Sequence, residues 1–371
     1  MFNKNDDNIK VCLYAIAKNE VDEVESWYDS VKEADQIIVL DTGSTDGTQE
    51  KFKALGVNVY ETTYPNGFRF DVARNDAMKI AYQTDCDVFL TIDLDERLNS
   101  GWCDIIKKTW DKNKHTRASY NYFYKDSITQ GTRNWIHDRT WKWCYPCHEA
   151  MIRNDSIFYT HNESLDLCGK VIMRHYPKPH KSTRSQYLPL LEIRIKENPH
   201  ECASWGYYIR ELMYANQYDK MIESYNRIKG EGFLGAEWAW CLIWTSVAYE
   251  YKGEIDKAIS LLLESIRVDK RFRTSYINLA SILNAQGMFC MAEGVLKQGL
   301  KDTPWETLSM FLDSNDVWNW RYYDWLYVVC FNQHKIEEAL KWISLALIEQ
   351  PDNPILQTHY QSCIKVLQEG R

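Results

Sequence analysis

The stretch that decides the fold is residues 87–96, which reads Asp-Val-Phe-Leu-Thr-Ile-Asp-Leu-Asp-Glu. Its apolar part, Val88–Ile92, is typical of a strand buried on both faces of a parallel sheet. In an extended chain residues i and i+2 point the same way, so Asp93 and Asp95 can converge just past the strand. Open α/β sheets bind ligands at that edge, and paired carboxylates suit Mg²⁺ or Mn²⁺. The alternative is a solvated acidic turn.

Strand-like and helix-like segments alternate on both sides of this stretch. The predicted strands are Val11–Ala17, Gln36–Leu40, Val57–Tyr60 and Val88–Ile92, all read as buried, and the predicted helices are Glu20–Glu33 and Asp71–Tyr82. Such alternation predicts an α/β domain with a mostly parallel sheet and right-handed crossovers.

Residues 100–180 lose this alternation and predict a helix followed by short antiparallel strands or loops. From Leu167 to Leu191 the chain has no acidic residue. Five cations lie in that range, at Lys170, Arg174, Lys178, Lys181 and Arg184. This basic segment is either a solvated connector or a segment near a phosphate-bearing ligand.

Beyond about residue 190 the pattern is helical throughout. The segments Gly253–Ala258 and Gly287–Ala292 lie 34 residues apart, and related junctions occur at Asn216–Met221 and His334–Ala339. This period resembles the tetratricopeptide (TPR) repeat, which stacks helix pairs into a superhelix. The last interval is longer, which predicts an insertion around Leu308–Trp320. We therefore predict two domains, residues 1–185 and residues 186–371, the second all-α.

Composition narrows the functional classes. The formal net charge of −8 argues against nonspecific nucleic-acid binding by the whole chain. The N-terminus lacks an apolar signal core and no run is long enough to span a membrane, so no membrane partner is expected. Eleven scattered cysteines indicate reduced thiols in a cytoplasmic protein. The segment Cys144–His148 has the C-x-x-C-H spacing, but without export haem attachment is not expected, and its irregular surroundings disfavour a redox motif.

Four motifs in order, each at a strand-to-helix junction, carry a family resemblance. They are residues 15–20 (AIAKNE), 38–48 (IVLDTGSTDGT), 70–75 (FDVARN) and 93–96 (DLDE). Residues 9–175 resemble the catalytic domain of glycosyltransferase family 2, which has the Rossmann-like GT-A fold. The combination with a TPR-like tail is similar to a subgroup that includes a bacterial enzyme glycosylating a peptide cysteine.

The resemblance implies a nucleotide site. Residues matching Ala17 and Glu20 line the nucleoside pocket, and Asp41 could accept a hydrogen bond from N3–H of uracil. Arg74 is expected to contact the nucleotide or the aspartate pair, although it could merely bridge to Asp71. The turn at residues 43–48 is expected both to form a pocket wall and to cap the next helix. Its capping residue is expected to be Ser44 or Thr45.

The resemblance also implies a metal site and a base. Asp93 would approach the ribose and the metal, Asp95 would bind the metal directly, and His175 matches a late histidine that often contacts metal or phosphates. Glu149 is the expected catalytic base of an inverting transfer, with His148 shaping the site or touching phosphate.

The predicted function is therefore a metal-dependent inverting glycosyltransferase. The cofactor would be Mn²⁺ or Mg²⁺ and the donor a nucleotide-sugar, specifically a UDP-sugar. The acceptor would be macromolecular, either a protein or peptide side chain or a glycan. One alternative is the same chemistry on a hydroxylated modified base in DNA. A second is a nucleotide-sugar-binding scaffold that acts through its helical repeats. A nucleotidyltransferase would need a Gly-rich triphosphate loop after the first strand, and Ala15–Glu20 is not one.

Overall fold

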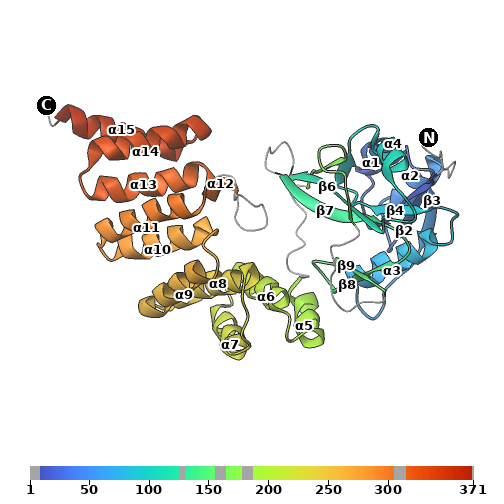
Figure 1. The fold of residues 1–371 in the computed structure, drawn as a ribbon, viewed down its shortest axis with the longest axis horizontal. Helices are drawn as coiled ribbons and strands as arrows, with labels where there is room; N and C mark the ends of the chain where they lie inside the picture. The colour runs from blue at the N-terminus through green and yellow to red at the C-terminus, as the bar shows by residue number, and fades with distance from the viewer. Residues whose placement is uncertain (1–8, 125–129, 155–163, 178–186, 305–314, 370–371) are drawn as a thin grey trace. The chain divides into compact units, whose positions relative to one another are not determined.

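The computed structural model describes residues 9–124, 130–154, 164–177, 187–304 and 315–369. The chain divides into two compact units, Met1–Arg194 and Ile195–Arg371. The division falls within helix α5 (Tyr187–Glu197), whereas the sequence prediction put it between residues 185 and 186. Figure 1 labels the elements of both units.

The N-terminal unit is built on a mixed sheet. Its strands are β1 (Val11–Ala17), β2 (Gln36–Asp41), β3 (Asn58–Glu61), β4 (Val88–Thr91), β5 (Glu96–Leu98), β6 (Arg117–Tyr124), β7 (Gln130–His137), β8 (Trp141–Cys144), β9 (Ala150–Arg153), β10 (Ser164–Asp166) and β11 (Ile172–His175). The large sheet has the order β3-β2-β1-β4-β7-β6-β11-β5, with β10 also paired to β6, and β8 and β9 form a separate antiparallel pair. Strands β1 to β4 run parallel, so their carboxyl ends lie at one edge.

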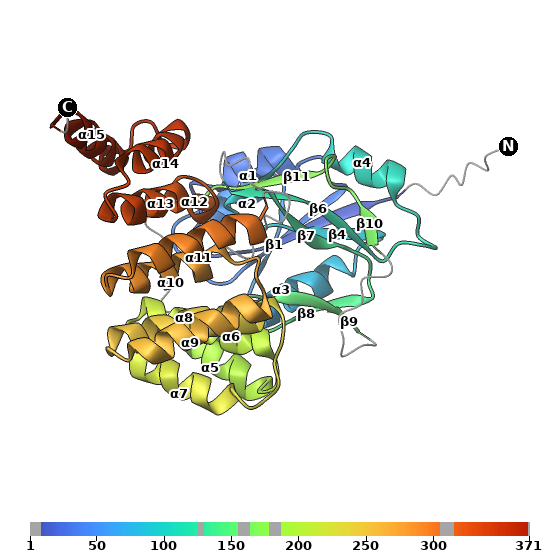
Figure 2. The ribbon, with the colours of Figure 1, turned by 60° about the vertical axis from the view of Figure 1, so that its left-hand side comes forward.

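Helices cover both faces of this sheet. They are α1 (Val24–Val31), α2 (Thr48–Ala54), α3 (Phe70–Ala81) and α4 (Trp102–Thr109). Side chains alternate along β1: Leu13 packs with residues of α1, α2 and α4, and Tyr14 packs with residues of α3, β8 and β9. Figure 1 shows α1, α2 and α4 on one side of the sheet and α3 with β8 and β9 on the other, and Figure 2 gives a second view. The α/β prediction is confirmed, including the fully buried β4.

Two elements differ from the sequence prediction. The helix expected from Glu20 begins only at Val24, after a turn. Strand β3, read as buried, is the edge strand of the sheet, and Tyr60 on it is 45% exposed. A short apolar run does not distinguish an edge strand from a central one, because partner strands decide burial.

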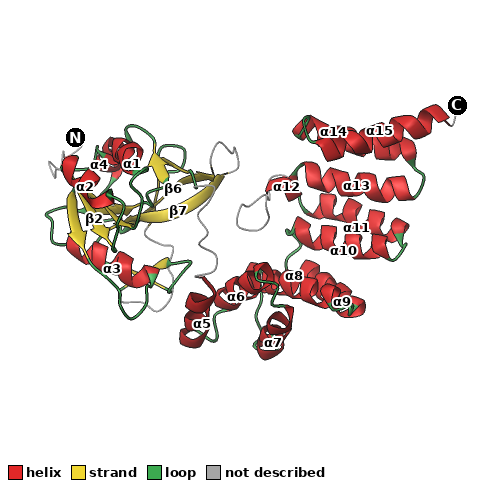
Figure 3. Ribbon diagram, turned by 180° about the vertical axis from the view of Figure 1, so that it is seen from behind, coloured by secondary structure: helices red, strands yellow, loops and turns green. Residues whose placement is uncertain are grey.

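The C-terminal unit is all helical in its described residues (Figure 3). Its helices after α5 are α6 (Cys202–Tyr214), α7 (Tyr218–Ile228), α8 (Ala236–Tyr251), α9 (Ile255–Val268), α10 (Arg273–Ala285), α11 (Phe289–Asp302), α12 (Asn315–Trp318), α13 (Trp320–Asn332), α14 (Ile336–Glu349) and α15 (Pro354–Glu369). Neighbouring helices pack in pairs, α8 with α9, α10 with α11 and α13 with α14. None of the described helices combines the length and apolarity needed to cross a bilayer.

The four junctions predicted from the repeat are equivalent turns. Asn216, Gly253, Gly287 and His334 have φ values of 55°, 74°, 74° and 57°, and a helix begins two residues after each. In each turn the next backbone N–H donates to a carbonyl five positions earlier, which closes the preceding helix. The helix pairs are therefore TPR-like. The predicted insertion lies largely outside the described residues, as does the part of the basic segment between residues 178 and 186.

Candidate active site

A cavity of about 590 Å³ lies at the carboxyl ends of β1, β2 and β4. It is lined by Ile16, Ala17, Lys18, Asn19, Glu20, Thr42, Phe68, Phe70, Asp93, Leu94, Asp95, His175, Pro177 and Tyr187. Five of the nine residues predicted from sequence are in this lining, namely Ala17, Glu20, Asp93, Asp95 and His175. The position agrees with the general rule for ligand sites in open α/β sheets.

A tight turn, rather than an extended strand, presents the two aspartates. Strand β4 ends at Thr91, and the backbone N–H of Asp93 donates to Oε2 of Glu96 over 2.8 Å. The Glu96 N–H in turn donates to the carbonyl of Asp93 over 3.0 Å. Both aspartates line the cavity, but Asp93 is more exposed than Asp95. The extended i, i+2 geometry expected from sequence is wrong, because the Glu96 side chain folds the chain back into β5.

Asp95 faces a histidine from the strand beside it. Nε2 of His175 lies 3.3 Å from Oδ2 of Asp95, and Nδ1 of His175 is hydrogen-bonded to the Tyr122 hydroxyl over 2.8 Å. Pairing of β11 with β5 sets this contact, since His175 is opposite Glu96. A carboxylate and an imidazole form a donor set that suits a divalent cation, Mn²⁺ in particular. The residues present therefore fit a divalent cation.

A second group of ligand-type side chains lies in the helical unit. Among the described residues, Glu293, Cys330 and Glu338 have donor atoms that all lie within 4.8 Å of one another. Glu293 is ion-paired to Lys297 and Lys335 at 2.6 Å each, so its charge is already compensated. We therefore place the candidate metal site at Asp95 and His175, where the cavity is, and not in the helical unit.

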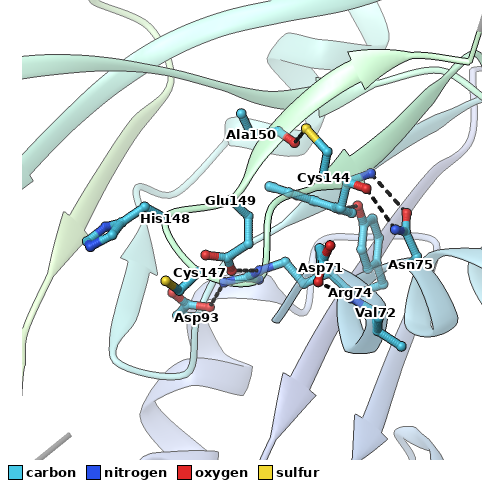
Figure 4. Close-up of polar contacts among 12 residues, drawn as sticks. Asp71, Val72, Arg74, Asn75, Asp93, Cys144, Cys147, His148, Glu149 and Ala150 are labelled. Atoms are coloured by element: carbon cyan, nitrogen blue, oxygen red, sulfur yellow. Dashed lines mark hydrogen bonds and ion pairs between the residues drawn. The ribbon is translucent and has the colours of Figure 1, made fainter. Parts of the chain in front are cut away.

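Arg74, on α3, joins the aspartate turn to the loop between β8 and β9. Its Nη2 donates to Oδ1 of Asp93 and its Nε donates to Oε1 of Glu149, both over 2.7 Å (Figure 4). The guanidinium lies 5.2 Å from the ring centroids of both Trp135 and Trp143. Burial opposes the charge of Arg74, but the two carboxylates outweigh it and raise its pKa above the ordinary value. Asp71, the alternative partner, pairs with Arg69 instead.

The loop that carries Glu149 is tied to two helices. The Phe70 N–H at the start of α3 donates to the Pro146 carbonyl over 3.0 Å. Nη1 of Arg194 in α5 donates to the carbonyls of Cys147 and His148, over 3.0 and 2.9 Å. His148 has a φ of 49°, in the left-handed region that few non-glycine residues adopt. The Glu149 carboxylate is thus held against Arg74 by its surroundings.

His148 points away from the Arg74 cluster (Figure 4). Its ring stacks on Tyr187 at a centroid distance of 5.5 Å and an interplanar angle of 24°. His148 thus continues an aromatic surface, and Glu149 next to it continues the ion-pair cluster. Sγ of the neighbouring Cys144 donates to the Ala150 carbonyl over 3.2 Å, and Cys147 is buried.

The carboxylate of Asp41 accepts hydrogen bonds from the residues that follow it. Its Oδ1 accepts from the backbone N–H groups of Gly43 and Ser44, over 3.0 and 2.8 Å, and from Nε2 of Gln49 over 2.8 Å. Asp41 is 1% exposed and is not part of the cavity lining, whereas Thr42 is. The Thr42 hydroxyl donates to the Ala17 carbonyl over 3.1 Å.

The turn and the first motif form one wall. The Thr45 N–H donates to Oδ1 of Asn19, and the Glu20 N–H donates to Oγ1 of Thr48, each over 2.8 Å. Helix α2 has Gly47 at its N-cap, with no side-chain capping bond, and Oδ1 of the preceding Asp46 accepts from the Thr48 N–H over 3.0 Å. The expectation that Ser44 or Thr45 caps this helix is wrong, because the helix begins later than the motif suggested.

Sequence reasoning missed the buried support of the aspartate turn. Glu96 is 1% exposed and its Oε1 accepts from Nη1 of Arg133 over 2.6 Å. Burial, opposed by Arg133, raises the pKa of Glu96 to about 7. The guanidinium of Arg133 lies 4.1 Å from the ring centroids of Tyr122 and Trp135. No local sequence signal links Glu96 to Arg133.

Residues 12–166 match the family model described as glycosyl transferase family 2. This stretch is similar to the family 2 glycosyltransferases. The match covers the cavity lining from Ile16 to Asp95, and His175, Pro177 and Tyr187 lie beyond it. Family 2 glycosyltransferases generally use a nucleotide-sugar donor and a divalent metal, and they act on an acceptor substrate. A search of curated proteins gives no match to the chain.

Several solved structures of TPR proteins are similar to part of the chain. TTC0263 from Thermus thermophilus is 20% identical with a TM-score of 0.37, over 49% of this chain and 90% of that one. YrrB, described as a TPR protein with an unusual peptide-binding site, is 13% identical with a TM-score of 0.38, over 48% and 84%. MamA is 16% identical with a TM-score of 0.36, over 46% and 85%.

Proposed function

We propose that this glycosyltransferase domain is metal-dependent and inverting, and that it moves a sugar from a UDP-sugar to a macromolecular acceptor, either a protein or peptide side chain or a glycan. The main support is the position of Arg74, which hydrogen-bonds Asp93 on the donor side and Glu149 on the acceptor side. A single guanidinium thus links the two carboxylates that a displacement reaction needs.

Asp95 and His175 are the residues that would hold a divalent cation, with Asp93 beside them. A cation bound there supplies Lewis-acid stabilisation to the leaving diphosphate. Since Arg74 already neutralises Asp93, we assign Asp93 to the ribose and the metal jointly and Asp95 to the metal alone.

The nucleoside would lie along the wall formed by Ala17, Glu20 and Thr42. The Thr42 hydroxyl donates its hydrogen to Ala17, so its oxygen keeps the capacity to accept an N–H such as N3–H of uracil. Asp41 holds the turn that positions Thr42, and we assign it that shaping role.

Glu149 acts as the general base. The acceptor nucleophile attacks the anomeric carbon, its proton passes to the Glu149 carboxylate, and the bond between the anomeric carbon and the phosphate oxygen breaks. The nucleoside diphosphate leaves with the bonding electrons, and the configuration inverts. Arg74 keeps Glu149 oriented, and His148 shapes the acceptor side.

The test is donor hydrolysis by the purified full chain, across a panel of nucleotide sugars, with Mn²⁺, with Mg²⁺ or with EDTA. Release of UDP with either metal and its loss with EDTA are expected. Asp95→Ala should abolish release, whereas Asp85→Ala, an acid exposed beyond the cavity and paired with Lys10, should not. Metal-independent release, or no release from any donor, would overturn the proposal.

A separate measurement tests the assignment of Glu149 as the general base. Glu149→Gln keeps the shape of the side chain and should lower transfer by roughly 10²–10⁴-fold while the affinity for UDP is unchanged. Weakened UDP binding in this variant would move Glu149 out of the base role. The linkage formed from a UDP-α-sugar should be β, as read by NMR of the product.

A further inference from the structure

One wall of the cavity is aromatic, and none of the motifs predicted it. Phe68, Phe70 and Tyr187 line the cavity together with the aspartates. Phe68 and Phe70 meet edge to face at 4.8 Å, and Phe70 and Tyr187 stack at 6.3 Å with an angle of 28°. Tyr187 stacks in turn on His148, the residue next to Glu149. The rings thus run from the cavity to the loop of the proposed base.

This aromatic wall, defined as Phe70 and Tyr187, is fixed to that loop. Phe70 is the first residue of α3, and its N–H is bonded to the Pro146 carbonyl. Both rings are half-buried, so part of each surface is accessible. Because Phe70 is bonded to Pro146 and Tyr187 stacks on His148, a group resting on the rings lies beside the loop that carries Glu149.

The chemistry around the wall selects a class of ligand. Aromatic faces carry negative charge density and attract the polarised C–H bonds of a flat, partly apolar ring. The carboxylate of Glu149, on the loop to which the wall is fixed, only accepts hydrogen bonds when it is ionised. A pyranose presents both features, C–H groups on its face and hydroxyl donors on its rim.

We propose that Phe70 and Tyr187 form an acceptor subsite for a sugar ring, so that the acceptor is a glycan rather than an unmodified peptide or DNA. This inference rests on the proposed function, and it selects one of the two acceptor classes. The acceptor ring stacks on the wall, and the hydroxyl that attacks the donor points to Glu149.

The experiment measures transfer by the full chain with the donor and metal that give hydrolysis. The acceptor panel consists of methyl glycosides of the common hexoses, pentoses and N-acetylhexosamines, with unmodified peptides and hydroxymethylcytosine-containing DNA for comparison. Methyl glycosides avoid an aromatic aglycone that would itself stack on the wall. Transfer to at least one saccharide is expected, and none to the peptides or the DNA.

Tyr187→Leu and Phe70→Leu keep apolar volume but remove the flat ring. Each should raise the KM for the saccharide at least tenfold, and by a larger factor than it changes the donor KM. The control is Tyr60→Leu, an exposed aromatic on the edge strand β3 outside the cavity lining, which should change neither KM. Circular dichroism and retained UDP binding show that each variant is folded.

Three results would overturn the inference while leaving the proposed function intact. They are hydrolysis of the donor with no transfer to any saccharide, transfer to peptide or DNA in preference to saccharides, and a rise in the donor KM in place of the acceptor KM. Absence of donor hydrolysis in the unaltered protein would instead remove the proposed function itself.

Discussion

Arg74 and Glu149 form a buried ion pair in which Nε of the guanidinium lies 2.7 Å from Oε1 of the carboxylate. Only 4% of the Arg74 side chain and 11% of the Glu149 side chain are exposed. Removing one partner of such a pair leaves a charge buried without compensation, which costs more than the pair itself contributes. Substituting either Arg74 or Glu149 should therefore destabilise the site.

We expect Arg74→Met to lower the free energy of unfolding of the N-terminal unit by about 3 kcal/mol. Most of this loss comes from Glu149, because the Asp93 side chain is 38% exposed and water screens it. Hydrogen exchange of the amides in α3 and β4, followed in the full chain, reports this unit separately from the helical one. The double variant Arg74→Met, Glu149→Gln should recover part of the loss, and a purely additive effect would contradict the pairing.

His175→Asn should change the metal preference rather than abolish metal binding. Loss of the imidazole removes the ligand that favours Mn²⁺ over Mg²⁺, and leaves the carboxylate of Asp95. We expect the affinity for Mn²⁺ in the presence of UDP to fall by roughly 10–100-fold, and that for Mg²⁺ to fall less. Calorimetry with each metal measures this, with the exposed His200→Asn in the helical unit as control. Equal losses for both metals would argue against ligation by His175.

Acid should destabilise the N-terminal unit through His137. Its Nε2 is 2.9 Å from the Tyr14 hydroxyl and its Nδ1 is 2.7 Å from the Asp138 carbonyl, so the neutral ring donates through Nδ1 and accepts through Nε2. Complete burial lowers the pKa of His137 to about 4. A depressed pKa stabilises the fold fully above the unfolded value of about 6.5, and this stability is lost as the pH falls towards 4.

Between pH 7 and pH 5 the free energy of unfolding should fall by about 2 kcal/mol, because a difference of one pKa unit corresponds to about 1.36 kcal/mol. Urea unfolding at several pH values measures it. His137→Gln, which has no titrating group, should be less stable at pH 7 but should show a much flatter pH dependence over this range. If the free energy of unfolding falls equally with pH in both proteins, His137 does not cause the acid destabilisation.

Alanine substitutions at two glycines in helix α11 should have opposite effects on the stability of the helical unit. A Cβ on Gly299 would lie 2.8 Å from Cγ of Tyr276 and would also collide with the Tyr322 hydroxyl, which donates to the Leu296 carbonyl. Gly299→Ala should therefore destabilise the helical unit by about 1–3 kcal/mol despite the better helix propensity. At Gly294 a Cβ meets nothing within 4 Å, so Gly294→Ala should stabilise by about 0.5–1 kcal/mol. Thermal unfolding compares the two, and equal effects would contradict the packing.

The sequence predicts most of this fold because its strongest signals are local. Strand β4 is buried on both faces, and the four helix junctions have the same turn, with a residue of positive φ two positions before a helix. The same local pattern, a buried strand followed by acidic residues, predicts that Asp93 and Asp95 lie at the edge of the sheet. It does not predict that Glu96 is buried, because Glu96 depends on Arg133 from a strand 37 residues away. A charged residue beside Asp95 reads as solvated unless that partner is known.

The aromatic wall could not be predicted for a related reason. Phe70 begins α3 and Tyr187 begins α5, so the two rings are far apart in the sequence and neither belongs to a periodic pattern. Their contact with one another, and with His148, follows only from the tertiary fold. Asp41 shows the same limit, since the motif predicts contact with the ligand but does not predict that its carboxylate accepts from the backbone of its own turn.

Asn75 exchanges two hydrogen bonds with the backbone of Trp143, donating from Nδ2 to the carbonyl over 2.8 Å and accepting the N–H at Oδ1 over 2.9 Å. One amide side chain thereby fastens the β8–β9 hairpin to α3. Since Arg74 is the residue before Asn75 and Glu149 follows strand β8, this clamp also keeps the two partners of the ion pair in register.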